Sequence, residues 1–397
     1  MTGIAVIGAG LAGSSAAWRL AQAGHDVVVL EQDTPAHRRG SSHGSARIFR
    51  YAYAERLYVD LVREAARGWA ELEAAGSTRL LTRTGALDHG AGHDPEGFAR
   101  VLAAAGVEHA LLGPAEASAR WPLRFETPVL WHPGAGVLDA EAAVVAMLDE
   151  ARAHGAALEQ GWRVTGVRRR GRGYRVHAGD GRWVDAEQVV VAAGGWLPDL
   201  LGDLDLPEAF VTALPALEVR QEQAYHFPYA EGPGAAWPTF IHRTEDMVVY
   251  GLPGGRDAGW SGQKVAEYNG GRRIRSAAAQ DGLVSGDNRR RVVAYVERHL
   301  PGLVPEPYAE TTCLFTNTPT EDFVIDRAEG ITVLSACSGH GAKFAPLLGQ
   351  LTLALVEGRD TVPGPFRPGR LRSSRSRPWP AGAGSAAQHL PGHGVAE

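Results

Sequence analysis

The chain has 397 residues, a length that suits two or three domains with a shared site between them. A hydrophobic fraction of 44% and a charged fraction of 21% are typical of a globular protein and exclude a disordered or fibrous one. The net charge of -5 is too small to favour nucleic acid as a partner. Only two of the 40 basic residues are lysines, Lys264 and Lys343, so we expect their positions to be informative.

The two cysteines, Cys313 and Cys337, are too few for a disulfide framework or a zinc site, and they favour a reducing compartment. The strand-like run Ile4–Ile7 stands close to the first residue and leaves no room for a signal peptide. No segment approaches the ~18 consecutive apolar residues of a membrane helix. We therefore expect a cytoplasmic, monomeric protein that binds no metal, no nucleic acid and no membrane.

A βαβ unit with a glycine-rich turn is predicted at the start of the chain. An apolar run ends at Ile7, and a helical pattern and a second apolar run, residues 27–30, follow the turn. The turn has the glycine spacing of a dinucleotide-binding motif, with Gly8, Gly10 and Gly13. Glycines let the backbone approach a pyrophosphate, and the N-terminus of the helix adds a partial positive charge. Glu31, at the end of the second run, can accept hydrogen bonds from ribose hydroxyls.

Two later segments look like further parts of the same domain. Val189–Ala193 is a buried-type strand that ends in glycines, and Ile331–Leu334 precedes a glycine-containing turn and a helical pattern to about Val356. Between these segments, alternating apolar residues around 216–219 and 246–250 predict an antiparallel sheet. An interrupted nucleotide domain closed by a C-terminal segment is typical of FAD enzymes, whereas nicotinamide-dependent dehydrogenases usually keep theirs contiguous. We therefore expect FAD.

The predicted fold is α/β plus α+β, with a Rossmann-like FAD-binding domain interrupted by an antiparallel-sheet substrate domain. We assign residues 1–80, 140–205 and 318–366 to the FAD-binding domain, and 81–139 and 206–317 to the substrate domain. Residues 367–397 are rich in Pro, Gly, Ser, Ala and Arg without a periodic apolar pattern, so a disordered tail is expected there.

Three segments resemble the monomeric sarcosine oxidases and N-methyltryptophan oxidases, which are FAD-dependent amine oxidases of the D-amino-acid-oxidase-like fold. Gly40–Tyr53 looks like the segment that follows the first βαβ unit in that family. Thr312–Thr318, together with Phe323–Asp326, is similar to the stretch that carries the family's covalent flavin. Ser338–Phe344 matches the family's closing motif, and the resemblance covers about residues 1–360.

The resemblance implies a covalently attached cofactor. In the family a cysteine sulfur is bonded to the 8α carbon of FAD, and this role carries over to Cys313. Taken alone, Cys313 would be read as a small buried thiol, as Cys337 is. His43 and Arg47 fall at family positions that assist attachment, where cations beside the ring would stabilise the anionic flavin. The closing motif places Gly339 and Gly341 among the residues that bind FAD.

The resemblance also implies how substrate and oxygen are held. Arg50 and Lys343 would bind the carboxylate of an amino acid, and Lys343 stands near the start of a predicted helix. Arg47 and Arg50 are three residues apart, so they share a face if this segment is helical. Lys264 aligns with the family lysine that activates O2, where a compact positive charge lowers the barrier to electron transfer.

Two positions depart from the family pattern on the substrate side of the flavin, where Tyr268 replaces a histidine and Phe315 replaces a tyrosine. We expect an oxidase that converts a secondary, N-methyl amino acid to an imine, which then hydrolyses, and that reduces O2 to H2O2. One alternative substrate is a cyclic imino acid, pipecolate-like or proline-like, or another small amine. The alternative from another class is a flavin-binding subunit without turnover of its own.

Overall fold

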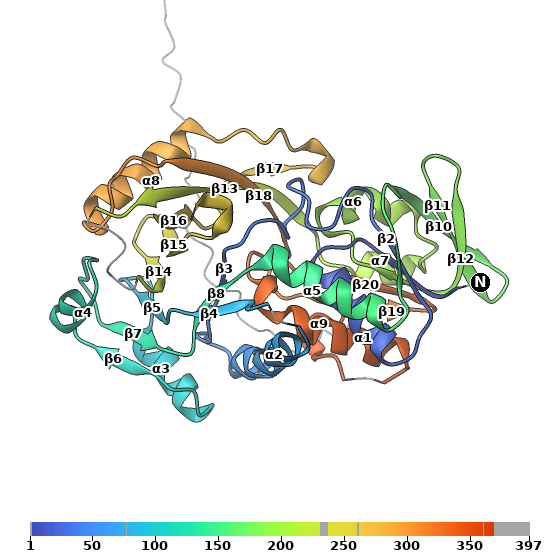
Figure 1. Cartoon of the computed structure of the whole chain (residues 1–397), viewed down its shortest axis with the longest axis horizontal. Helices are drawn as coiled ribbons and strands as arrows, with labels where there is room; N and C mark the ends of the chain where they lie inside the picture. The colour runs from blue at the N-terminus through green and yellow to red at the C-terminus, as the bar shows by residue number, and fades with distance from the viewer. Residues whose placement is uncertain (1, 77, 231–236, 260–261, 360, 369–397) are drawn as a thin grey trace, which may run out of the picture.

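A computed structural model describes residues 2–76, 78–230, 237–259, 262–359 and 361–368. Two large β-sheets lie side by side along the longest axis of the molecule, with β10 (Val164–Arg170), β11 (Gly173–Ala178) and β12 (Trp183–Val191) near one end and β5 (Ala86–His89) and β7 (Val129–His132) near the other (Figure 1). No helix of the described residues is long and apolar enough to cross a membrane. Of the predicted disordered tail, residues 369–397 lie outside the described residues.

The first sheet contains the predicted glycine-rich βαβ unit. Its strand order is β10-β11-β12-β1-β2-β9, with β20 paired to β12 and β19 paired to β20. Its strands are β1 (Thr2–Ile7), β2 (Val27–Leu30), β9 (Ala157–Glu159), β10 (Val164–Arg170), β11 (Gly173–Ala178), β12 (Trp183–Val191), β19 (Val324–Ala328) and β20 (Ile331–Ser335). The strands β9, β2, β1, β12 and β20 run parallel, so all four strands predicted for the nucleotide domain fall in one sheet.

Four helices pack together against this sheet because each carries an apolar face. They are α1 (Leu11–Gln22), α2 (Arg56–Ala75), α5 (Ala140–Ala153) and α9 (Ala345–Val356). Helix α1 lies between α5 and α9, and α2 packs on α9. Trp18 and Leu20 of α1 and Trp69 of α2 are fully buried in the core that they share with β1 and β2. The short helices α6 (Leu197–Leu200) and α7 (Glu208–Ala213) follow β12.

The second sheet is largely antiparallel, as the alternating patterns predicted. Its order is β17-β13-β16-β15-β14-β5-β7-β6, with β18 also paired to β13, and only the β14–β5 pair is parallel. Its strands are β5 (Ala86–His89), β6 (Ala110–Leu112), β7 (Val129–His132), β13 (Glu218–Pro228), β14 (Thr239–Arg243), β15 (Val248–Pro253), β16 (Gly262–Glu267), β17 (Arg272–Ile274) and β18 (Ala309–Asn317). Helix α8 (Gly286–His299) packs Val292 and Val296 against the core of this sheet. Helices α3 (Pro95–Ala104) and α4 (Pro114–Arg120) lie near β6 and β7 (Figure 1).

A three-stranded sheet, in the order β3-β8-β4, supplies one wall of the site described below. Its strands are β3 (Arg47–Phe49), β8 (Gly136–Leu138) and β4 (Leu81–Arg83). The helical interpretation of Arg47 to Arg50 is therefore wrong, because β3 pairs with β8 over a long sequence separation. The predicted domain boundaries stay a prediction.

Candidate active site

A cavity of about 620 Å³ lies where the sheets meet and contains most of the predicted site residues. Those that line it are Gly8, Gly10, Glu31, Arg47, Arg50, Lys264, Tyr268, Cys313, Gly339, Gly341 and Lys343. Gly13 and His43 are not among its lining residues. The strands of both large sheets and the segments around residues 40–58 and 335–343 therefore contribute to one site.

The glycine-rich turn after β1 has no room for side chains. Gly8 has a left-handed φ of 98°, and a Cβ there would lie 2.6 Å from the carbonyl oxygen of Ala192. A Cβ on Gly13 would lie 1.9 Å from the carbonyl oxygen of Gly8, so Gly13 packs the turn without reaching the cavity. Gly10 precedes α1 and has no side chain to cap it. The turn thus presents backbone and a helix N-terminus to the cavity, as a pyrophosphate requires.

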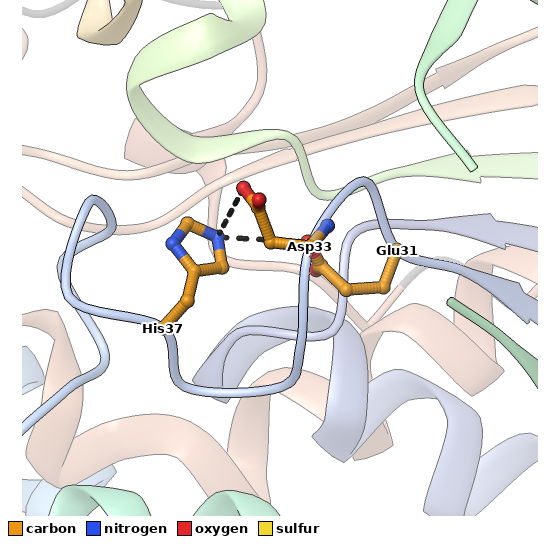
Figure 2. Close-up of side chains that lie close together, drawn as sticks. All are labelled: Glu31, Asp33 and His37. Carbon is orange, nitrogen blue, oxygen red and sulfur yellow. Dashed lines mark hydrogen bonds and ion pairs between the residues drawn. The ribbon is translucent and has the colours of Figure 1, made fainter. Parts of the chain in front are cut away.

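Figure 2 shows Glu31, Asp33 and His37 close together in the loop after β2. Glu31 Oε2 accepts a hydrogen bond from the Ala9 N–H at 2.8 Å, and Oε1 accepts one from the Asp33 N–H at 2.9 Å. Burial raises the pKa of Glu31, but the His37 hydrogen bond and the backbone donors outweigh burial and hold the pKa below its usual range. Asp33 also pairs with Arg39. Glu31 is therefore an ionised, fixed acceptor that lines the cavity, and such an acceptor suits the ribose of a dinucleotide better than a metal ion.

Arg50 reaches the cavity from the end of β3 and is anchored by a buried carboxylate. Its Nη1 donates to Asp88 Oδ1 at 3.0 Å and also to the carbonyl oxygen of Ala52. Asp88 is fully buried, and its Oδ2 lies 3.1 Å from His132 Nε2. The guanidinium is thus oriented by a partner that the sequence did not reveal.

Lys343 lies in a 3-10 turn, η5 (Gly341–Phe344), just before α9, and it is buried. Its Nζ donates to the Tyr53 hydroxyl at 2.9 Å and to the His340 carbonyl oxygen at 2.7 Å. His340 Nε2 lies 3.0 Å from the Glu321 carbonyl oxygen, which can only accept, so Nε2 carries a proton. Burial, Lys343 and Arg50 lower the pKa of His340 to about 3, so the ring is neutral and Nδ1 accepts from the Tyr53 hydroxyl at 3.0 Å. This chain of hydrogen bonds leaves the Tyr53 oxygen free to accept from Lys343 and holds the amine at the cavity wall, where burial and the nearby Arg50 lower its pKa well below the usual value.

Lys264 and Cys313 come from β16 and β18, the two strands of the second sheet that flank β13, and both line the cavity. Burial and the nearby Arg47 lower the pKa of Lys264 to about 8. Burial raises the pKa of the Cys313 thiol, although Arg47 and Lys264 act in the opposite direction. Arg47 Nη2 donates to the carbonyl oxygens of Ser41 and His43, which fixes the loop beside the cysteine.

His43 does not supply the positive charge that the sequence led us to expect. Burial, Arg47 and Lys264 lower its pKa to about 3, so the imidazole is neutral at neutral pH. Its Nε2 is buried and has no hydrogen-bond partner among the described residues. The cations beside Cys313 are therefore Arg47 and Lys264.

Tyr268 and Phe315 form an aromatic wall, with their ring centroids 5.6 Å apart. The Tyr268 hydroxyl lies 2.9 Å from Glu321 Oε1 and 3.1 Å from the Ser338 carbonyl oxygen. Glu321 also lines the cavity and has a left-handed φ of 62°. No sequence signal marks Glu321 or Asp88, whereas Tyr53 and His340 lie inside the motifs Gly40–Tyr53 and Ser338–Phe344.

Residues 3–355 match the family described as "DAO: FAD dependent oxidoreductase". The chain belongs to this family. It is 32% identical to human peroxisomal sarcosine oxidase, with 93% of this chain and 96% of that protein covered. It is 30% identical to N-methyl-L-tryptophan oxidase of Yersinia pestis, with 89% and 94% covered.

The solved structures agree on the fold. A structure described as an unusual amino acid oxidase essential for nikkomycin biosynthesis superimposes with a TM-score of 0.81 at 24% identity, covering 92% of this chain and 97% of that one. L-proline dehydrogenase from P. horikoshii gives a TM-score of 0.77 at 21% identity over 92% and 97% of the two chains. The predicted fold and family are thus confirmed, and the chain is an FAD-dependent, sarcosine oxidase-like flavoprotein that acts on CH–NH bonds.

Proposed function

We propose that the protein oxidises a secondary, N-methyl amino acid to an imine, which hydrolyses, with reduction of O2 to H2O2. The observation that carries the proposal is the pair of basic side chains, the half-buried Arg50 and the buried Lys343, in the wall of the cavity that Lys264 and Cys313 also line. Burial lowers the pKa of Lys343 well below its usual value, and a bound carboxylate would favour the charged form of its amine, while Arg50 can meet the carboxylate as a planar donor. An amine without a carboxylate would make neither of these contacts.

The described residues fit FAD, since the glycines of the turn after β1, the ionised Glu31 and Cys313 all line the cavity. When bound, the flavin takes two electrons and a hydrogen from the carbon next to the substrate nitrogen and passes the electrons to O2. Lys264 would stabilise the negative charge that develops on oxygen. The cationic, buried surroundings lower the pKa of the substrate ammonium, which favours the neutral amine with its free lone pair.

A second candidate substrate is a cyclic imino acid. The rings of Tyr268 and Phe315 face Gly339, at which a Cβ would lie 2.6 Å from Tyr268 and 2.9 Å from Phe315. A small saturated ring fits beside such a wall as well as an N-methyl group does. This candidate keeps the same carboxylate contacts and differs only in the shape of the amine.

The test is release of H2O2 from the purified yellow protein with a matched panel of amines. We expect turnover with N-methyl or cyclic amino acids and at least about 100-fold lower kcat/KM with the same amines lacking the carboxylate, because the charge-assisted bonds to Arg50 and Lys343 are lost. A flavin-binding subunit without turnover would bind FAD, yet no amine of the panel would bleach its colour. That result would overturn the proposal.

We further propose that Cys313 holds the flavin covalently. Acid denaturation should leave the yellow colour with the polypeptide, and Cys313→Ser should release it into the supernatant. Cys337→Ser is the matched control, since Cys337 also lines the cavity and should not affect retention. Flavin lost from the denatured wild-type protein would refute the covalent bond while leaving the oxidase proposal intact.

A further inference from the structure

Glu222 is a buried carboxyl group that the proposed chemistry does not use. It lies in β13, and only 1% of its surface is exposed. Its Oε2 accepts a hydrogen bond from the Gly271 N–H at 3.0 Å, whereas its Oε1 is buried and has no partner among the described residues. Leaving a buried carboxyl oxygen unpaired is costly, so such an atom calls for an explanation.

The strand register places Glu222 beside the flavin-attachment cysteine. Strands β13 and β18 are antiparallel, and Glu222 is directly opposite Cys313. Residues opposite each other in an antiparallel pair project from the same face with Cβ atoms about 4.5–5.5 Å apart, which lets their side chains meet. His226, four residues further along β13, is in turn opposite Lys264. Glu222, Cys313 and Lys264 thus share the face of the sheet that borders the cavity.

Burial raises the pKa of the Cys313 thiol, so the loss of its proton calls for a nearby group that can accept it. Arg47 and Lys264 stabilise a thiolate at Cys313, while burial and Glu222 oppose it. The titratable groups that act on Glu222 itself, from its own and neighbouring strands, are Arg220, Glu218, Glu267, Tyr250 and Cys313. Only Arg220 among these is a cation, and burial dominates. A carboxylate without a close counter-ion is well suited to accept a proton from the neighbouring thiol.

We propose that Glu222 accepts the thiol proton of Cys313 when the flavin is attached. The inference rests on the proposed covalent bond. In this step the bond between sulfur and the 8α carbon forms, while the S–H bond and one C–H bond of the 8α methyl group break. The flavin gains the electron pair and both hydrogens, the thiol hydrogen as a proton by way of Glu222. O2, the oxidant of the proposed reaction, then takes the two electrons and two protons and leaves as H2O2.

The protonation state of Glu222 gives the step a pH dependence. Burial raises the pKa of Glu222 to about 7, against the opposing hydrogen bond from the Gly271 N–H. Below this pH the carboxyl is protonated and cannot accept. Covalent attachment should therefore accelerate as the pH rises from 6 to 8, and a variant without the carboxyl should lose this rise.

The experiment mixes FAD with protein produced without flavin and follows the fraction of flavin that stays with acid-precipitated polypeptide. Glu222→Gln should slow attachment at pH 8 by about 100-fold, the range in which a positioned base contributes. Glu222→Asp should restore part of the rate and its rise with pH. Glu310→Gln is the matched control, because Glu310 lies on β18 three residues from Cys313, faces the other side of the sheet and pairs with Arg289.

Two measurements distinguish the loss of a proton acceptor from a defect in folding or in FAD binding. Binding of FAD before attachment, and the thermal melting curve, show whether Glu222→Gln folds and holds the cofactor. Equal attachment rates and pH profiles in wild type and Glu222→Gln would overturn the role of Glu222 but leave the covalent bond at Cys313 intact. No covalent flavin even in the wild type would overturn the attachment at Cys313 and this inference with it.

Discussion

At the scale of single residues, the orientation of Arg50 depends on the ion pair that it forms with Asp88. Asp88 is fully buried against Arg50, at 3.0 Å, and against His132 and His93, at 3.1 and 3.8 Å. Breaking such a cluster is costly, because the charge of Arg50 then has no ionic partner in a largely buried place. The orientation of Arg50 toward a substrate therefore depends on a residue outside every recognised motif.

Asp88→Asn should lower the free energy of unfolding at pH 7 by about 3 kcal/mol. Burial raises the pKa of Asp88, but Arg50 and the His132 hydrogen bond outweigh it and hold the pKa below its usual range. The carboxylate thus contributes stability above the unfolded pKa of about 4, and this is lost as the pH falls through the lower folded pKa. Urea unfolding at pH 7 and pH 3 should show the difference between wild type and variant shrinking in acid. Asp60→Asn, which removes exposed pairs with Arg56 and Arg63, should cost less than about 1 kcal/mol at either pH.

At the scale of elements, the helices and strands that could be predicted are those marked by a pattern of residues within their own segment. The glycine turn, β1, α1 and β2 follow from apolar periodicity and glycine spacing, and the alternation at 216–219 and 246–250 marks β13 and β15. The strand at Arg47–Phe49 was missed because its partner, β8, lies about ninety residues away and leaves no local pattern. Asp88 and Glu222 were missed for the same reason, since each has chemical meaning only beside a distant strand.

The loop between β20 and η5 offers a test of how an element shapes the site. Gly339 has a φ of 68°, and a Cβ there would press on Tyr268 and Phe315. Gly358 has a φ of 77° and open space around it, so Gly358→Ala matches the backbone strain without the contact. Both variants should lose about 1 kcal/mol of stability, but only Gly339→Ala should lower kcat/KM, by about tenfold, as the aromatic wall is displaced. Equal kinetic effects of the two substitutions would contradict a role for this wall.

At the scale of the whole molecule, the cavity is a junction between two sheets that are otherwise distinct. The glycine turn after β1 and the end of β12 supply one side, and β15, β16 and β18 supply the other. A cofactor that fills the cavity contacts both sides at once. It should therefore stabilise the two sheets together, although their strands are not paired with each other.

This predicts how FAD should act on a protein in which it is free to dissociate. In Cys313→Ser, each tenfold increase of FAD above its dissociation constant should add about 1.4 kcal/mol to the free energy of unfolding, because the ligand binds only the folded state. Hydrogen exchange should show new protection in peptides from both sheets, around residues 5–14 and 248–268. Residues 110–120 form β6 and α4 and do not line the cavity. They are the internal control, and direct contact with FAD should add no protection from hydrogen exchange there. Protection confined to residues 5–14 would mean that FAD contacts only the first sheet, and Lys264 and Cys313 would then lie too far from the flavin for their proposed roles.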